Sequence, residues 1–204
     1  MGNACGSKAG VSDTAKKTSA FKTSDELLDF DTFFPKGTKS ALARCMTKEM
    51  WEEYKDMKDD SDVTFKTCIF SGVKNLDSGI GLYAGSHSSY TKFEKLFDAV
   101  IQDYHGHGKE DKHVSDMTSE GIENAEFSEE DAAMIKSSRI RVGRNLDGYP
   151  LGPGITKEQR DEVMEKVKSA AETFEDDLKG TFYPLDGMTD ETEKQLIADH
   201  VLFK

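Results

Sequence analysis

Residues 75–84 read NLDSGIGLYA, and this stretch decides how the first half of the chain is interpreted. Two glycines stand close together in it, Gly79 and Gly81, and such a pair costs backbone entropy in any regular element. A strand would prefer β-branched residues here, and a helix would prefer almost any other residue. One explanation is a turn between two helices. The other is a loop that must approach a ligand closely, with Asp77 and Tyr83 at its ends.

The composition describes an acidic globular protein. The chain has 204 residues and a formal net charge of −12, and its 12 Phe and 6 Tyr can supply a core. A negative charge disfavours nucleic acid as a partner, because phosphate backbones attract basic surfaces. Cys5, Cys45 and Cys68 lack paired spacing, so we expect neither a disulfide framework nor a zinc site, and infer a reducing intracellular compartment. No apolar run has the length of a membrane span, and no signal peptide is recognised.

The first 22 residues predict a flexible basic arm. Gly2 follows the initiator Met, as N-myristoylation requires, although Gly6 stands where the acylation pattern has Ser or Thr. Cys5 is placed for a second, palmitoyl chain. One acyl chain holds a membrane only marginally and two hold it firmly. An unmodified tail is the alternative.

Apolar periodicity predicts helices through the region up to residue 106. Thr23 and Glu26 have the spacing of a capping box, and a helix is expected to follow Thr47. The clearest helix runs from Ser89 to Gly106 and should turn one apolar stripe toward the core. The stripe consists of Phe93, Leu96, Phe97, Val100, Ile101 and Tyr104.

The stretch HGHGKEDKH, residues 105–113, is rich in histidine. Glycine and lysine interleave the imidazoles and no carboxylate frame accompanies them, so a solvated connector is favoured over a metal site. Residues 135–145, IKSSRIRVGRN, then alternate in the manner of a strand. Capping-box spacing at Thr156 and Gln159 predicts a helix that continues to Leu178. A second strand is expected at residues 181–185, and a last helix after Thr189.

Two arginines on the predicted strand share one face with Ser137. Arg139 and Arg141 would stand about 7 Å apart, given the rise of a strand. Their planar, permanently charged guanidinium groups could clamp a polyphosphate through bidentate bonds. Exposed charges that protect a sheet edge are the alternative.

Three long blocks together resemble one known family. NLDSGIGLYA, SSRIRVGRNLDGYPLGPGIT and LKGTFYPLDGMTDETEKQLIADHVLFK are similar to segments of the phosphagen (ATP:guanidino) kinases, and within them the arginine kinases. DAVIQDYH and the following DKH fit as well. The resemblance extends over roughly residues 40–204.

The resemblance implies a fold and a set of domains. A small all-helical N-terminal domain (23–115) would follow the arm (1–22). A linker (116–130) would lead to the first part of a catalytic, nucleotide-binding domain (131–204), a mixed domain with an antiparallel β-sheet flanked by helices.

The resemblance also implies roles for individual residues. The glycine-rich loop would be the guanidino-specificity loop, which meets the carboxylate and amino end of arginine. Asp77 would pair with an arginine of the second domain when the enzyme closes. Nucleotide contacts would come from Ser137, Arg139, Arg141 and His200. The loop residues concerned are Ser78, Gly79, Ile80, Gly81, Leu82 and Tyr83.

The implied reaction is the reversible transfer of the γ-phosphoryl group of MgATP to L-arginine, with nucleotide as substrate and no tightly bound cofactor. The family's paired glutamates and reactive cysteine correspond to positions beyond Lys204, so we expect a fragment that is inactive alone. The alternative is an inactive, membrane-tethered binding or scaffold module. The expected location is the cytoplasm, at a membrane or cilium if the arm is acylated. The sequence does not predict an oligomeric state.

Overall fold

The computed structural model describes residues 19–121, 126–138 and 140–202. The chain divides into two compact units, residues 1–155 and 156–204, and each is described by itself. The described helices of the first unit are α1 (Ala41–Cys45), α2 (Lys48–Tyr54), α3 (Phe65–Lys74), α4 (Ser89–Lys92), α5 (Glu94–His105) and α6 (Glu129–Met134). Short 3₁₀ turns precede them at Ser24–Glu26 and Phe30–Thr32. No helix among the described residues is long and apolar enough to cross a membrane.

Hydroxyl side chains start the first three helices. The Ser40 hydroxyl accepts a hydrogen bond from the Ala43 N–H at 3.2 Å. Thr47 and Thr64 cap α2 and α3 in the same way. Each cap satisfies a backbone donor that has no partner within its helix, so the helix after Thr47 is confirmed.

The expected long helix at residues 89–106 is confirmed with a break. The backbone of Phe93 departs from helical geometry and separates α4 from α5, and Gly106 ends α5 with φ 71°. Most of the predicted apolar stripe is buried, but Tyr104, at its end, is 55% exposed. Tyr104 lies in the last turn of α5, which ends at His105.

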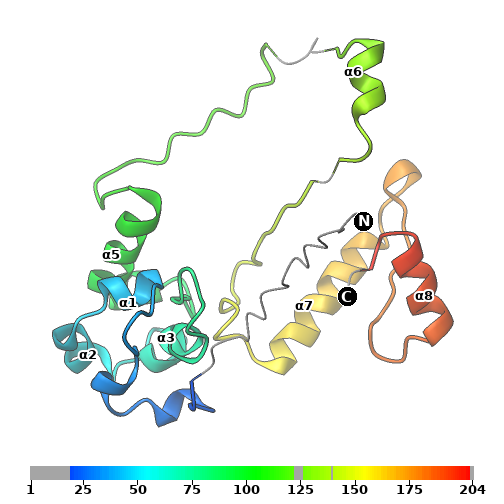
Figure 1. The fold of residues 1–204 in the computed structure, drawn as a ribbon. Coiled ribbons are helices and arrows are strands. Elements are labelled where there is room, and N and C mark those ends of the chain that lie inside the picture. Colours follow the sequence, from blue (N-terminus) through cyan, green and yellow to red (C-terminus); the bar gives the residue numbers. More distant parts are fainter. Residues whose placement is uncertain (1–18, 122–125, 139, 203–204) are drawn as a thin grey trace, which may run out of the picture. The chain divides into compact units, whose positions relative to one another are not determined.

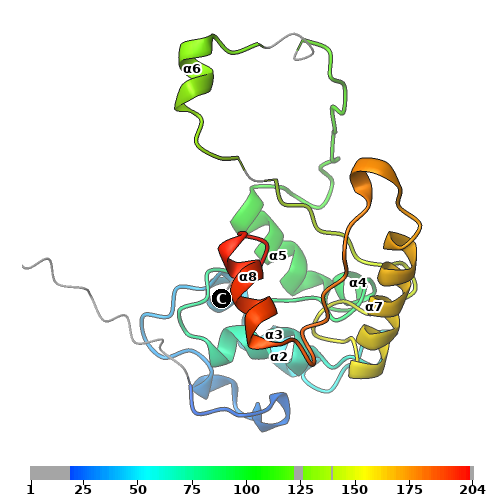
Figure 2. The same cartoon turned by 90° about the vertical axis from the view of Figure 1, so that its right-hand side faces the viewer.

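Aromatic side chains form the centre of the first unit, where α1, α2, α3 and α5 gather (Figure 1). Trp51 on α2 meets Phe33 edge to face, with ring centroids 4.8 Å apart. Phe65 on α3 meets Phe93 at 5.1 Å. Such pairs add about 0.5–1.5 kcal/mol each to the gain from burial. Figure 2 shows this helical body from a second direction.

The expected strands are not seen. Residues 135–145 are extended where described, yet no described segment pairs with them, and residues 181–185 are irregular as well. The described residues include an isolated antiparallel bridge between Lys58 and Thr64, and no strand. Alternation makes a segment suitable for a sheet, but a strand forms only when a neighbour completes the hydrogen-bond ladder.

The second unit contains α7 (Lys157–Ala171), a 3₁₀ turn (Asp176–Leu178) and α8 (Asp190–Ala198). The predicted capping box of Thr156 and Gln159 is present, and Thr189 caps α8. The prediction that α7 continues to Leu178 is wrong, because the helix ends at Ala171. None of the residues of α7 is buried, so no packed apolar face extends the helix further.

The other expected capping box, at Thr23, is also wrong. The Thr23 side chain makes no capping bond, and a single 3₁₀ turn follows. The Glu26 carboxylate instead accepts a hydrogen bond from the Lys22 N–H at 2.8 Å. One satisfied donor does not supply the nucleation that a full helix needs.

Candidate functional site

The glycine-rich loop joins α3 to α4 and rests on the N-terminus of α1. The Ala41 N–H donates to the Gly79 carbonyl at 2.9 Å, and the Leu42 N–H donates to the Ile80 carbonyl at 2.9 Å. Together with the Ser40 cap, these bonds satisfy three of the backbone donors that begin α1. Helix and loop therefore fix each other.

This anchoring sets the direction of two backbone amides. In a trans peptide the N–H points opposite to the C=O of the same unit. Since the Gly79 and Ile80 carbonyls face α1, the N–H groups of Ile80 and Gly81 point away from it. Neither amide donates to any described residue. Adjacent free amides of this kind form a concavity that suits an anion such as a carboxylate.

A close crossing of two backbones explains Gly81. Its φ is 82°, and a Cβ at this position would lie 2.8 Å from the Gly72 Cα on α3. A Cβ on Gly72 would in turn collide with the Gly81 carbonyl. Both positions therefore require glycine, one for its conformation and both for the contact. Gly79 has open space around it and no such requirement.

Tyr83 carries the exposed aromatic ring of the loop. Its N–H donates to the Cys68 carbonyl of α3 at 2.9 Å, and the residue is 46% exposed. Leu82 and Ala84, on either side, are buried. Tyr83 lines a hollow of about 460 Å³ beside α3 and another of about 220 Å³ beside α5.

A buried carboxylate holds the end of the loop. Asp59 Oδ2 accepts from the Ser86 hydroxyl at 2.8 Å and from the Ser89 hydroxyl at 2.6 Å. The Ser89 hydroxyl accepts from the Gly85 N–H at 3.0 Å. Burial opposes ionisation of Asp59, yet the hydrogen bonds from Ser89, Ser86 and two backbone amides outweigh it and lower its pKa.

The other predicted site residues are dispersed. Asp77 is exposed in the turn before the glycines. Ser137 and Arg141 are exposed on the extended segment, and Arg139 lies outside the described residues. His200 belongs to the second unit, exposed, with φ 60°. The lipidation candidates Gly2 and Cys5 also lie outside the described residues.

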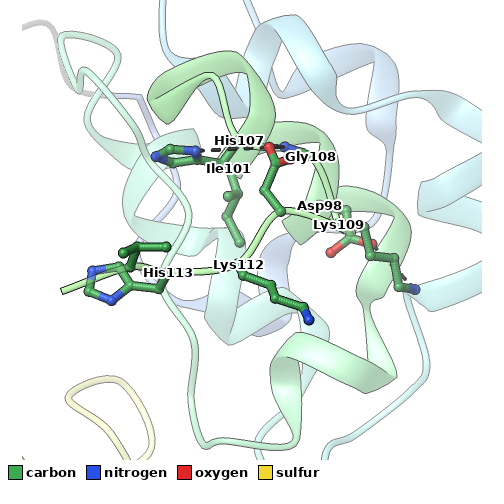
Figure 3. Close-up of a pocket in the computed structure, with 9 residues that line it drawn as sticks. Asp98, Ile101, His107, Gly108, Lys109, Lys112 and His113 are labelled. Atoms are coloured by element: carbon green, nitrogen blue, oxygen red, sulfur yellow. Dashed lines mark hydrogen bonds and ion pairs between the residues drawn. The ribbon is translucent and has the colours of Figure 1, made fainter.

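The histidine-rich segment after α5 lines a hollow of about 620 Å³ (Figure 3). Lys109 pairs there with Glu94 at 2.7 Å and with Asp98 at 3.6 Å. The imidazoles of His107 and His113 do not converge on one point in Figure 3. Among the described residues no group of three His, Cys, Asp or Glu side chains is placed to hold a metal ion.

Sequence reasoning missed the residues that anchor the loop. Gly72 could have been noticed as a glycine inside a helical segment, which often marks a close approach. Ser40 is an ordinary capping serine in the sequence. Asp59 lies in an acidic stretch, DMKDDSD, where nothing distinguishes a buried carboxylate from its exposed neighbours.

Comparison with known proteins gives these features a family. Residues 36–102 match the sequence profile described as ATP:guanido phosphotransferase, N-terminal domain. The arginine kinase of Limulus polyphemus is 45% identical over 167 residues, which span 81% of this chain and 46% of that protein. The arginine kinase of Anthopleura japonica is 44% identical over 167 residues, covering 81% of this chain and 23% of its own length.

Solved structures of related kinases share the fold. A lombricine kinase superposes with a TM-score of 0.71 at 31% identity, over 88% of this chain and 48% of that one. The duplicated taurocyamine kinase of Schistosoma mansoni gives a TM-score of 0.71 at 25% identity, over 85% and 25% of the two chains. The chain belongs to the phosphagen kinase family, and its curated homologues are arginine kinases, which are transferases. It spans less than half the length of these relatives.

Proposed function

We propose that this chain supplies the guanidino-binding side of an arginine kinase, which transfers the γ-phosphoryl group of MgATP reversibly to L-arginine. In this proposal, residues 23–115 form the substrate-binding domain. Residues 131–204 begin the nucleotide-binding domain, with its antiparallel sheet, after a linker at 116–130. MgATP and MgADP act as substrates, and no tightly bound cofactor is needed.

The observation that carries the proposal is the pair of free amides at Ile80 and Gly81. Ile80 and Tyr83 line the same hollow beside α5, so a carboxylate at the amides could leave its aliphatic chain beside an aromatic face. Ser78 and Leu82 flank the pair. L-Arginine has a carboxylate, a short aliphatic stem and a cationic guanidinium, which aromatic faces attract. The arginine kinases among the relatives support this choice of substrate over other guanidino compounds.

Phosphate binding is proposed for the extended segment. Ser137, Arg139 and Arg141 would contact the nucleotide, and His200 would add a further contact. Asp77, exposed before the loop, would pair with an arginine of the second domain on closure. Phosphoryl transfer depends on alignment and neutralisation of charge, and these contacts would serve both. We expect the 204-residue chain to bind L-arginine at the glycine-rich loop.

Calorimetric titration tests the binding step. L-Arginine should bind, whereas L-citrulline, which has the same stem and carboxylate but a neutral urea group, should bind more weakly. Tyr83→Ala should weaken L-arginine binding by about 1–2 kcal/mol, the scale of a lost cation–π contact. Tyr183→Ala removes a tyrosine of similar exposure, 47%, from the second unit and serves as the control. Equal affinity for both ligands would contradict the proposal.

Acylation of the arm at Gly2 and Cys5 is a separate part of the proposal. It rests on the sequence alone and would bring the kinase to a membrane, for example along a cilium. The intact mass of the native protein would show an acyl chain directly, and would show whether the native protein is heavier than 22.7 kDa. A Gly2→Ala variant that still sediments with membranes would count against the anchor.

A further inference from the structure

The segment at residues 148–155 is seated on the helical body beside the glycine-rich loop. The Leu151 N–H donates to the Gly85 carbonyl at 2.8 Å. The Leu151 side chain packs against the hydrophobic core. The N–H groups of Gly154 and Ile155 both donate back to the Leu151 carbonyl, at 2.9 and 3.0 Å. The segment is thus a closed turn, fixed by its own bonds and by one backbone contact.

The turn can lie this close to the helical body because residue 154 is glycine. A Cβ on Gly154 would lie 2.5 Å from the Gly85 carbonyl oxygen and 2.5 Å from Val63 Cγ2. Gly85 belongs to the end of the glycine-rich loop, where Ser89 and Asp59 already hold the backbone. The turn therefore rests on a fixed part of the helical body.

The seated turn forms one wall of the hollow beside Tyr83. Gly152 and Pro153 line that hollow together with Thr67 and Phe70 of α3. The face of Phe70 already attracts a cation, since Lys74 Nζ lies 5.5 Å from its ring centroid. Tyr83 lines the same hollow, with its backbone bonded to α3 and its ring exposed.

We propose that the 148–155 turn positions the Tyr83 ring and so sets which guanidino compounds this side of the site accepts. Pro153 and Gly152 are positioning residues in this account. They limit how far the ring can swing away from α3, and the fixed backbone at Gly85 keeps the wall in place. The part of the inference that concerns substrate choice rests on the proposed function, whereas the positioning of Tyr83 does not.

Gly154→Ala tests the positioning. The added methyl group should unseat the turn, because its neighbours include backbone that cannot move. Gly143→Ala is the matched control, because Gly143 lies outside the turn and its Cβ would meet no atom within 4 Å. In the 204-residue chain, the Leu151 amide should exchange its hydrogen about tenfold faster or more in Gly154→Ala and unchanged in the control. The NMR signals of the Tyr83 ring should shift in Gly154→Ala alone.

A Leu151 amide that exchanges freely in the wild-type chain would overturn the proposal. So would unshifted Tyr83 signals in a Gly154→Ala variant whose turn has come loose. If Gly154→Ala does not fold, Leu151→Ala can replace it, because it removes the side chain that packs against the core. The exchange of the residue 151 amide and the Tyr83 ring signals are then measured with the same expected outcomes.

Titration with L-arginine and then with taurocyamine separates the two claims. The wild-type chain should bind L-arginine more tightly than taurocyamine. In the unseated variant the ratio of the two affinities should fall about tenfold, the scale of one misplaced contact. If the wild-type chain binds neither compound, the proposed function fails while the positioning of Tyr83 is still decided by the NMR comparison. An unchanged preference in the unseated variant would refute the role in substrate choice.

Discussion

At the scale of single residues, the loop depends on two glycines that approach each other at a crossing. Gly72→Ala places a methyl group against the Gly81 carbonyl, and overpacking of this kind destabilises a protein by about 1–3 kcal/mol. Urea unfolding followed by fluorescence measures the change, because Trp51 is the single tryptophan and lies in the core. Gly79→Ala, with open space at its Cβ, should be near neutral. Equal stability of the two variants would contradict the crossing.

The lowered pKa of Asp59 predicts how stability depends on pH. A carboxyl group with a lower pKa in the folded than in the unfolded state stabilises the fold above its unfolded pKa, about 4. That contribution is lost as the pH falls through the folded pKa. Asp59→Asn should reduce the loss of stability in acid and should lower stability at neutral pH, by about 1–3 kcal/mol.

The neighbouring Asp60 provides the control for that experiment. It pairs with Lys92 at 3.0 Å on the exposed surface, where ion pairs contribute little. Asp60→Asn should therefore leave both the midpoint in urea and its pH dependence nearly unchanged. If Asp59→Asn behaved like Asp60→Asn, the claim that the buried Asp59 carboxylate stabilises the fold would be wrong.

At the scale of elements, two local signals predicted helix ends correctly, whereas the capping-box spacing at Thr23 did not produce a helix. The capping box that starts α7 and the glycine that ends α5 are local, and both were predicted correctly. The strand at residues 135–145 was not seen, because its ladder needs a partner that alternation within the segment cannot supply. The end of α7 at Ala171 was missed for a related reason, since apolar spacing was taken for a packed face.

Part of the candidate site was identified from the sequence, and part became visible only in the structure. The glycines and the bounding residues Asp77 and Tyr83 identified the loop from the sequence. The elements that fix it come from elsewhere: the start of α1, the middle of α3 and the carboxylate of Asp59. Those contacts join residues far apart in the chain, and a single sequence carries no signal for the pairing.

The segment between α5 and α7 should be the first to be cleaved by trypsin. Lys112, Lys136 and Arg141 are exposed on it, and none of the residues of α6 is buried. Proteases cut where backbone is accessible and weakly bonded. Limited digestion followed by mass spectrometry should show early cuts within residues 107–147 and an intact helical body with unchanged Trp51 fluorescence. First cuts inside α1 to α5 would contradict this description.

At the scale of the whole molecule, the proposed guanidino-binding face lies within the first unit. Its parts are the N-terminus of α1, the loop, α3 and the turn at residues 148–155. The proposed phosphate ligands lie on the extended segment and in the second unit. The matched residues make up 46% and 23% of the two relatives, which agrees with a division of substrate binding and phosphoryl transfer between segments.

The most direct test of the central claim is a titration of the ¹⁵N-labelled 204-residue chain with L-arginine, followed by the shifts of its backbone amide signals. If Ile80 and Gly81 bind the substrate carboxylate, their amides should show the largest shifts, with smaller ones at Ser78 and Tyr83. Two results would contradict the assignment of this loop as the guanidino site. In one, L-arginine saturates a site elsewhere while the amide signals of residues 78–83 do not shift. In the other, no amide signal of the chain shifts at all.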